Sequence, residues 1–251
     1  MLPTSTLEGK WDPRVRQPED TEQQLDIIGT RNVDENTETF NPRVTTHGTT
    51  ADGFRLFADE RAAKALPIIA HHREDNNPEV VVHTDGSATN NGIAEARAGS
   101  GIYFGPGDPR NRALRIPDEW GPSNQVGELA AIKEAAEMCP KGTPLKIVSN
   151  SRYAINAVTK YLQKTEDNGF LPTANGELIA LTVASLQVRC GKTTLQWVKG
   201  HAGDEGNKAA NALAVQGAAK DTPDKIRQGD MNLVERGVKL RTITQSKAED
   251  D

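Results

Sequence analysis

The chain has 251 residues, of which 35% are hydrophobic and only 4% aromatic, and its formal net charge is −5. This length supports one good-sized core with polar flanks, and the sequence has no apolar run of about 18 residues that would predict a membrane span. Residues 79–220 have a net charge of +1 and residues 1–78 one of −5, so any nucleic-acid-binding face must be local and salt-sensitive.

The two ends of the chain are polar. Residues 1–50 are rich in Thr, Glu, Asp, Asn and Pro without an apolar period, and we expect a disordered acidic arm there. Residues 51–78 contain a few apolar anchors, such as Phe54 and Ile68, and then a polar linker, which predicts a short docked arm. Residues 221–251 are polar again and are expected to form a C-terminal tail with a short docked segment.

The regular elements are predicted between residues 79 and 220. Short apolar or β-branched runs bounded by turn residues predict five strands, at 79–87, 99–106, 112–117, 144–150 and 193–200. Apolar residues at helical spacing predict four helices, at 123–139, 151–164, 177–190 and 204–220, the first with Ser123 as N-cap. The order β-β-β-α-β-α-α-β-α predicts an α/β fold with a five-stranded mixed sheet and helices on both faces.

Four polar side chains stand at positions that such a sheet would bring together. Asp85 ends the first strand, Glu128 lies one turn into the first helix, Asn150 follows the fourth strand and Asn211 lies on the last helix. The ends of the first and fourth strands are expected to be neighbours, with the two helix positions facing them.

Four ordered motifs resemble the ribonuclease H family that is specific for RNA–DNA hybrids. They are TDGS at 84–87, the Glu128 helix with SNQ before it, SNS and YAIN within 149–156, and WVKGHAG with GN and ALA within 197–214. The flanks resemble fungal, retroelement-related members. The resemblance implies a ribonuclease H-like fold, an RNA–DNA hybrid as partner, and hydrolysis of the RNA strand with two Mg²⁺ ions, or Mn²⁺, held by four carboxylates.

Two of the four metal-binding acids that the resemblance implies are replaced. Asp85 and Glu128 match the first two acids, whereas Asn150 and Asn211 stand where the family has Asp, and Lys208 stands where it has Glu. Two dications require a strongly anionic site, so we expect weak metal occupancy and lost or strongly reduced turnover. The asparagines are explained either by natural loss in a pseudoenzyme or by engineered Asp→Asn changes.

The resemblance also assigns a loop histidine and several nucleic-acid contacts. His201, in KGHAG, matches the mobile-loop histidine that assists product release or proton transfer. Amides for the minor groove, tyrosines for the DNA-strand channel and residues for phosphate are expected at Asn91, Asn124, Gln125, Arg152, Tyr153, Tyr161 and Asn175. The stretch LQKTEDNGF after Tyr161 lacks the Trp- and Lys-rich protrusion of many members, which predicts fewer phosphate contacts. Because the arm is acidic, deleting residues 1–50 is expected to leave binding unchanged or tighter.

Three functions are compatible with these residues. They are a working hybrid ribonuclease that tolerates the two asparagines, an inactive hybrid-binding domain, and a protein-interaction scaffold that has lost nucleic-acid binding. The sequence has no Cys/His cluster or Gly-rich phosphate loop, so we expect no small-molecule cofactor. We expect an intracellular protein, nuclear or cytoplasmic, that is monomeric and makes no membrane contact.

Overall fold

The computed structural model describes residues 35–42, 55–56, 76–89, 96–171, 173–200, 203–226, 229, 233–234 and 237–242. All of them belong to one unit, Asp34–Asp251. Asn91 and His201 lie outside the described residues. Within the described part of the chain, no helix combines the length and the hydropathy that crossing a bilayer would require.

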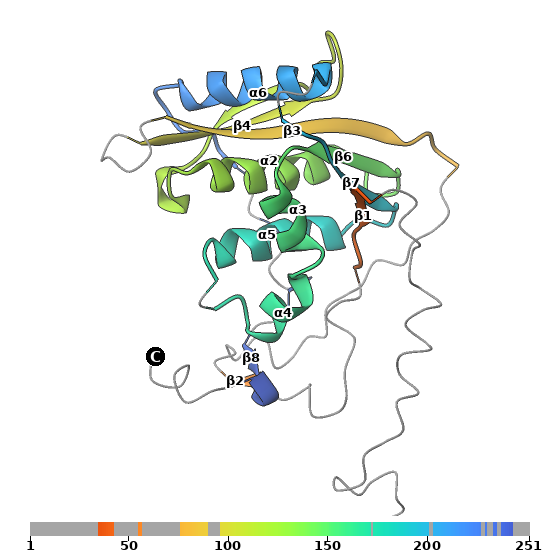
Figure 1. The fold of residues 1–251 in the computed structure, drawn as a ribbon, viewed down its shortest axis with the longest axis vertical. Helices are drawn as coiled ribbons and strands as arrows, with labels where there is room; N and C mark the ends of the chain where they lie inside the picture. Colours follow the sequence, from red (N-terminus) through yellow and green to blue (C-terminus); the bar gives the residue numbers. More distant parts are fainter. Residues whose placement is uncertain are drawn as a thin grey trace, which may run out of the picture. The chain divides into compact units, whose positions relative to one another are not determined.

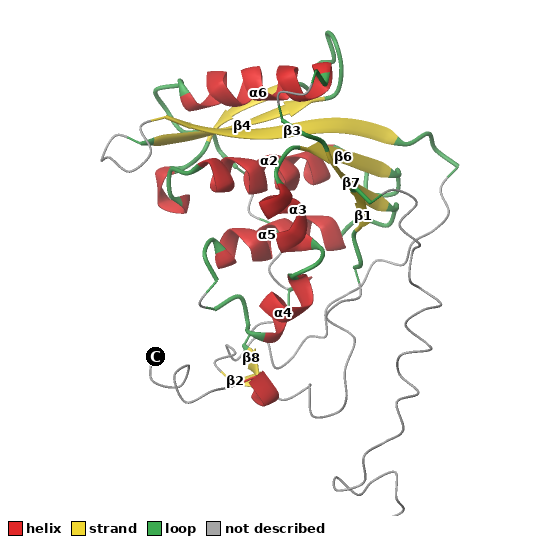
Figure 2. Ribbon diagram, viewed as in Figure 1, coloured by secondary structure: helices red, strands yellow, loops and turns green. Residues whose placement is uncertain are grey.

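The main sheet has six strands in the order β1-β7-β6-β3-β4-β5. Figures 1 and 2 label β1, β7, β6, β3 and β4. The strands are β1 (Thr37–Thr39), β3 (Val80–Thr89), β4 (Arg97–Tyr103), β5 (Arg112–Arg115), β6 (Leu145–Ser149) and β7 (Thr193–Trp197). The pairs β3–β6 and β6–β7 are parallel, whereas β1–β7, β3–β4 and β4–β5 are antiparallel. The predicted mixed α/β sheet is confirmed, with one strand more than expected.

Helices cover both faces of this sheet. α6 (Glu205–Ala218) packs on one face, against β3, β4 and β5, and α2 (Asn124–Met138) packs on the other. α5 (Gly176–Gln187) packs against α2 on the side away from the sheet (Figure 1). Two glycines permit the close approach: a Cβ at Gly86 would lie 2.4 Å from the Glu128 nitrogen of α2. A Cβ at Gly101 would lie 1.8 Å from the Ala210 oxygen of α6. Gly101 is paired with Asp85, the residue before Gly86 on β3. Successive positions of the sheet therefore face α6 and α2 in turn, as the alternation along a strand requires.

The helix predicted for residues 151–164 is divided into two. α3 is Arg152–Val158 and α4 is Leu162–Asp167, with the break at Thr159. The Thr159 hydroxyl donates to the Ile155 carbonyl at 2.7 Å, one turn back in the helix. A β-branched residue that bonds its own preceding turn competes with helix continuation, which explains why the helix ends there.

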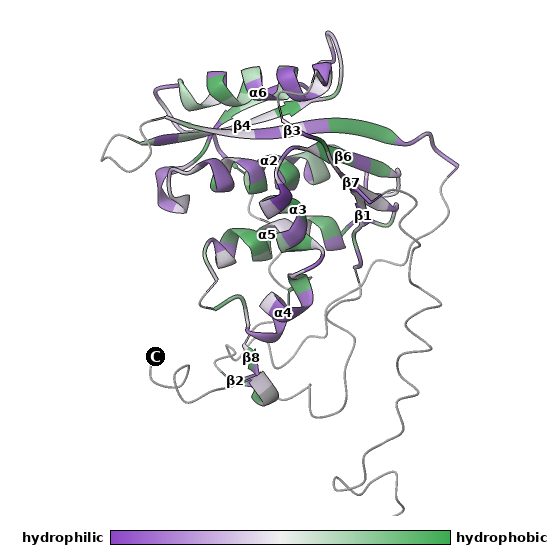
Figure 3. Cartoon of the chain, viewed as in Figure 1, coloured by the Kyte–Doolittle hydropathy of each residue, from purple (hydrophilic) through white to green (hydrophobic). Residues whose placement is uncertain are grey.

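The core lies between the sheet and the α2–α5 layer. Ile102, Leu129, Ile147 and Leu195 are fully buried, and Figure 3 shows α5 mostly in hydrophobic colours. Cys139 and Cys190 are both free thiols. The predicted N-cap is also confirmed, because the Ser123 hydroxyl accepts from the Val126 N–H at 3.2 Å.

Residues 37–40 differ from the disordered arm that was predicted for residues 1–50. Thr37, Glu38 and Thr39 pair with β7, and the Phe40 N–H donates to the Thr193 carbonyl at 3.0 Å. The Phe40 side chain is only 2% exposed. Strand β1 therefore covers the edge that β7 would otherwise leave unpaired. The other limits of the arm, the domain and the tail stay predictions.

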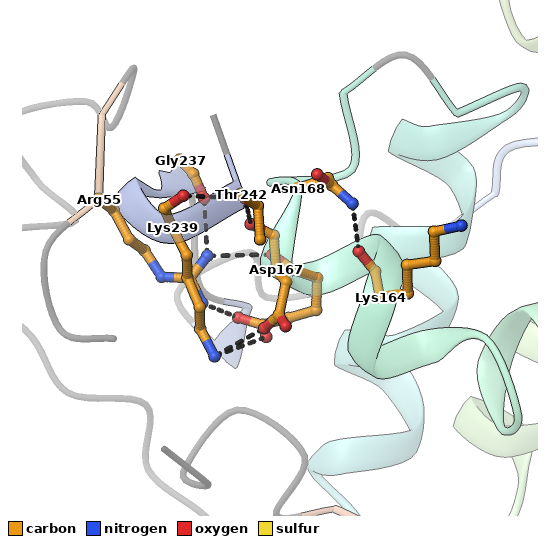
Figure 4. A network of polar contacts seen from close by, with 8 residues as sticks. Arg55, Lys164, Asp167, Asn168, Gly237, Lys239 and Thr242 are labelled. Carbon is orange, nitrogen blue, oxygen red and sulfur yellow. Dashed lines mark hydrogen bonds and ion pairs between the residues drawn. The ribbon is translucent and has the colours of Figure 1, made fainter. Parts of the chain in front are cut away.

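A buried ionic network joins both flanks to α4 (Figure 4). β2 (Arg55–Leu56) pairs with β8 (Val238–Lys239) in a separate two-stranded sheet. Arg55 forms an ion pair with the Glu166 carboxylate and donates to the carbonyls of Glu166 and Gly237, at 3.0 and 2.6 Å. The Lys239 ammonium lies 2.6 Å from the Asp167 carboxylate. We call Arg55, Glu166, Asp167 and Lys239 the terminal clasp.

Candidate functional site

Asp85 and Asn150 meet where two parallel strands separate. The last pair of the parallel β3–β6 ladder is Thr84 with Ser149. Asp85 and Asn150 are the next residues of the two segments. The Asn150 amino group donates to the Asp85 carboxylate at 3.2 Å. The Gly86 N–H donates to the other Asp85 oxygen at 2.8 Å. The structure thus brings together two of the four expected site residues, where the parallel β3–β6 pairing ends. Asp85 does not end its strand as expected, because β3 continues to Thr89 in its pairing with β4.

Glu128 lies beside them through the closeness of α2 to β3. The Ser151 hydroxyl donates to the Glu128 carboxylate and also accepts from the Ala154 N–H, which makes it the N-cap of α3. Burial raises the pKa of Glu128; the Asp85 charge raises it further, while the Ser151 hydrogen bond opposes the shift. Asp85 therefore interacts with both Asn150 and Glu128, which links three of the four predicted residues.

Asn211 is placed by the packing of α6 rather than by a hydrogen bond among the described contacts. Asp85 is paired directly with Gly101 in the β3–β4 ladder, so both residues point to the same face. Gly101 lies against Ala210, the residue before Asn211 on α6. The turn of α6 that carries Asn211 therefore crosses the sheet next to the strand position of Asp85. Lys208, expected to add positive charge there, forms an exposed ion pair with Glu205 at 2.8 Å.

The donor set does not fit the two dications that the resemblance implies. It offers two carboxylates and two amides, and the described residues contain no group of three or more His, Cys, Asp or Glu that could hold a metal ion. Asn150 also directs its amino group, not its oxygen, at Asp85. Asp85 and Glu128 are the two groups of this set that could attract a cation.

Replacing Glu128 by Gln is expected to stabilise the folded protein at pH 7. A carboxyl whose folded pKa is raised penalises folding once it is ionised, so its contribution becomes less favourable as pH rises through that pKa. Gln removes this penalty at pH 7, and the gain should vanish as the pH falls below about 4, where the acid is protonated in both states. Thermal unfolding between pH 4 and 8 measures it, with exposed Glu119→Gln as the control. A lower melting temperature for the Glu128 variant at pH 7 would contradict the assignment.

The described residues that were expected to contact nucleic acid lie at or near the starts of helices α2, α3, α4 and α5. Asn124 and Gln125 are exposed in the first turn of α2. The Tyr153 hydroxyl donates to the Ala174 carbonyl at 3.2 Å and accepts from the Asn175 amino group at 3.0 Å. Tyr161, directly before α4, is 51% exposed. Two of the expected nucleic-acid-binding residues, Tyr153 and Asn175, are therefore hydrogen-bonded to each other.

Arg152 and Trp197 form a stack directly beside Asn150. The Arg152 guanidinium carbon lies 3.7 Å from the centre of the Trp197 ring. The Trp197 indole N–H donates to the Asn150 carbonyl at 3.0 Å. Trp197 packs against the core while partly exposed, and its indole also holds the Asn150 backbone.

Sequence reasoning missed two polar residues at this site, Ser151 and Asn36. Ser151 could have been found, because a serine between a strand and a helix is a frequent N-cap. Asn36 carried no such signal, since it contacts Arg152 and Trp197 from 116 residues away or more.

Comparison with known proteins gives a consistent picture. The RNase H family model matches residues 77–219. Human ribonuclease H1 is 36% identical over 144 residues, covering 55% of this chain and 50% of that protein. Ribonuclease H of Schizosaccharomyces pombe is 38% identical over 144 residues, covering 56% and 53%. The chain thus spans about half the length of these curated relatives.

Among solved structures, the crystal structure of LC9-RNase H1, a type 1 RNase H with the type 2 active-site motif, is similar, with a TM-score of 0.48 and 25% identity. The match covers 70% of this chain and 86% of that one. The family match extends over more than half of the chain and includes Asp85, Glu128, Asn150 and Asn211. The chain therefore belongs to the RNase H family.

Proposed function

We propose that this chain binds RNA–DNA hybrids and cleaves their RNA strand far more slowly than a family member with four acids. The observation that carries the proposal is the hydrogen bond from the Asn150 amino group to Asp85. An amide donor satisfies an oxygen of the carboxylate that should face a metal ion. The hydrogen bond thus partly compensates the Asp85 charge in the absence of metal, while the two amides reduce the attraction for two cations.

The loss of charge predicts a large effect on catalysis. Replacing two carboxylates by amides changes the formal charge of the four side chains from about −4 to −2, and at an effective dielectric near 20 each lost contact with a dication is worth several kcal/mol. A divalent cation at such a site would supply water activation and stabilisation of the leaving oxygen. In this chain, Asp85 and Glu128 would hold the cation, and Ser151 would orient Glu128.

Substrate binding depends less on the missing acids. Asn124 and Gln125 offer donors and acceptors suited to 2′-hydroxyl groups in a minor groove. Tyr153 with Asn175, Tyr161 and Arg152 would follow the DNA strand and its phosphates. We keep Asn91 and His201 as proposed groove and loop residues. The fungal, retroelement-related character, the monomeric state and a nuclear or cytoplasmic location also remain proposals.

A protein-interaction scaffold is the second candidate. Glu166 and Asp167 belong to the stretch that was expected to make fewer phosphate contacts than the Lys-rich protrusion of many family members. Both are buried in the terminal clasp and bound by cations of the same chain. Together with the nearly neutral domain, this reduces the surface available to phosphate.

Competition binding separates the two candidates. A labelled hybrid of about 18 base pairs is titrated with the protein, and unlabelled hybrid, duplex DNA and duplex RNA compete for it. The proposal expects the hybrid to compete at least about tenfold better than duplex DNA, and the binding to weaken steeply with salt. Equal and weak competition by all three nucleic acids would favour the scaffold.

A further inference from the structure

The start of strand β1 reaches the candidate site, although it lies outside the family-matched residues 77–219. The Asn36 carbonyl accepts from the Trp197 N–H at 2.7 Å, which extends the β1–β7 pairing by one residue. The Asn36 side-chain oxygen accepts from the Arg152 guanidinium at 3.4 Å. A residue of the N-terminal arm therefore contacts two residues beside Asn150.

These contacts hold the Arg152 guanidinium from two sides. The indole of Trp197 lies against its face at 3.7 Å, and the Asn36 amide oxygen binds its edge. Arg152 is nevertheless exposed. A guanidinium has five N–H donors in a fixed plane, and Asn36 uses one of them. The remaining donors can meet a ligand without first losing the freedom of a long side chain.

We propose that Asn36 is a positioning residue that orients Arg152 toward a phosphate of the bound nucleic acid, an inference that rests on the proposed function. An exposed planar cation next to Asn150 fits a phosphodiester oxygen, which arginine binds with paired hydrogen bonds. In a domain of net charge +1, a single well-oriented cation supplies a larger share of the attraction to phosphates than it would on a strongly basic surface. The N-terminal arm thus completes the nucleic-acid site.

Asn36→Ala tests this role without removing the strand. The carbonyl bond to Trp197 and the β1–β7 ladder use backbone atoms, so they are kept while the Arg152 contact is lost. We expect hybrid affinity to fall about two- to fivefold in Asn36→Ala and about tenfold in Arg152→Ala. The slope of log affinity against log salt should fall by about 0.9 in Arg152→Ala and by less in Asn36→Ala. Asn36→Ala should have no further effect in the Arg152→Ala background. Thr39→Ala, on the same strand, is the control and should bind like the wild type.

Two truncations extend the test. Deleting residues 1–33 removes acidic chain but keeps β1, and binding should be unchanged or tighter. Deleting residues 1–50 also removes Asn36 and Phe40, and binding should weaken, contrary to the expectation from sequence alone. Circular dichroism at the assay temperature confirms that each variant is folded.

The outcomes distinguish this inference from the proposed function. If the wild type does not prefer the hybrid, both fail. If Arg152→Ala weakens hybrid binding but Asn36→Ala changes neither affinity nor salt slope, the positioning role alone is refuted. Equal losses from Asn36→Ala with and without Arg152 would likewise exclude coupling between the two residues.

Discussion

Changing Asn150 and Asn211 together to Asp is expected to raise Mg²⁺-dependent hydrolysis of the RNA strand of a hybrid by about a thousandfold or more. Two restored charges at metal contacts supply several kcal/mol, and each 1.36 kcal/mol is about tenfold in rate. Hydrolysis of an end-labelled hybrid under single-turnover conditions measures the change. The rate should again be lost when Asp85→Asn or Glu128→Gln is added to the restored variant.

A charge-matched control separates the site from a general electrostatic effect. Gln163 and Gln216 are exposed residues of α4 and α6, so Gln163→Glu with Gln216→Glu adds the same charge elsewhere. This control should leave the rate unchanged. A restored variant that cleaves no faster than the control would show that positions 150 and 211 are not part of the catalytic site.

The same double substitution should make stability depend on metal. Asn150→Asp removes the amide that donates to Asp85 and places two carboxylates side by side, so the metal-free restored variant should melt below the wild type. Mg²⁺ binds the folded form preferentially and should raise the melting temperature of this variant more than that of the wild type.

Breaking the terminal clasp is expected to have the largest effect on stability. Arg55→Met removes the cation that pairs with Glu166, whose side chain is fully buried, and Lys239 nearby is 2% exposed at its side chain. Lys239, 4.0 Å from the Glu166 carboxylate, is then the remaining cation, and removing one partner of a buried ion pair costs about 3–5 kcal/mol. Urea unfolding, read from the midpoint at constant slope, gives the free energy of unfolding.

Two variants control this measurement. Arg55→Met combined with Glu166→Leu removes both charges and should recover most of the loss. Lys208→Met breaks the exposed pair with Glu205, whose side chains are 55% and 85% exposed, and should change stability by less than about 1 kcal/mol. If Arg55→Met and Lys208→Met destabilise equally, the clasp does not hold the flanks to α4.

The fold of residues 79–220 was predictable because its elements are local patterns. Apolar runs predicted five of the six strands in the main sheet, and helical spacing predicted α2, α5 and α6. Strand β1 is the polar sequence Thr-Glu-Thr, and it exists because β7 offers an unpaired edge more than 150 residues away along the chain. The terminal clasp depends on contacts between Arg55, α4 and Lys239, and such distant pairings leave no periodic signal.

The candidate site was predictable where the parallel pairing of β3 with β6 determines it. Asp85 and Asn150 follow paired positions of parallel strands, so their contact follows from the topology. The orientation of the Asn150 amide, the Ser151 bond to Glu128 and the contact of Asn36 with Arg152 depend on side-chain geometry that sequence spacing does not determine.

A single-turnover experiment that follows binding and cleavage in one sample is the most direct test of a hybrid-binding site with reduced hydrolysis. Wild-type protein in excess is mixed with a fluorescent hybrid in Mg²⁺, anisotropy reports binding, and a gel reports the integrity of the RNA. We expect full binding with the RNA intact over a time in which the variant with both Asn150→Asp and Asn211→Asp cuts it completely. Cutting by the wild type at the rate of that variant would contradict the account.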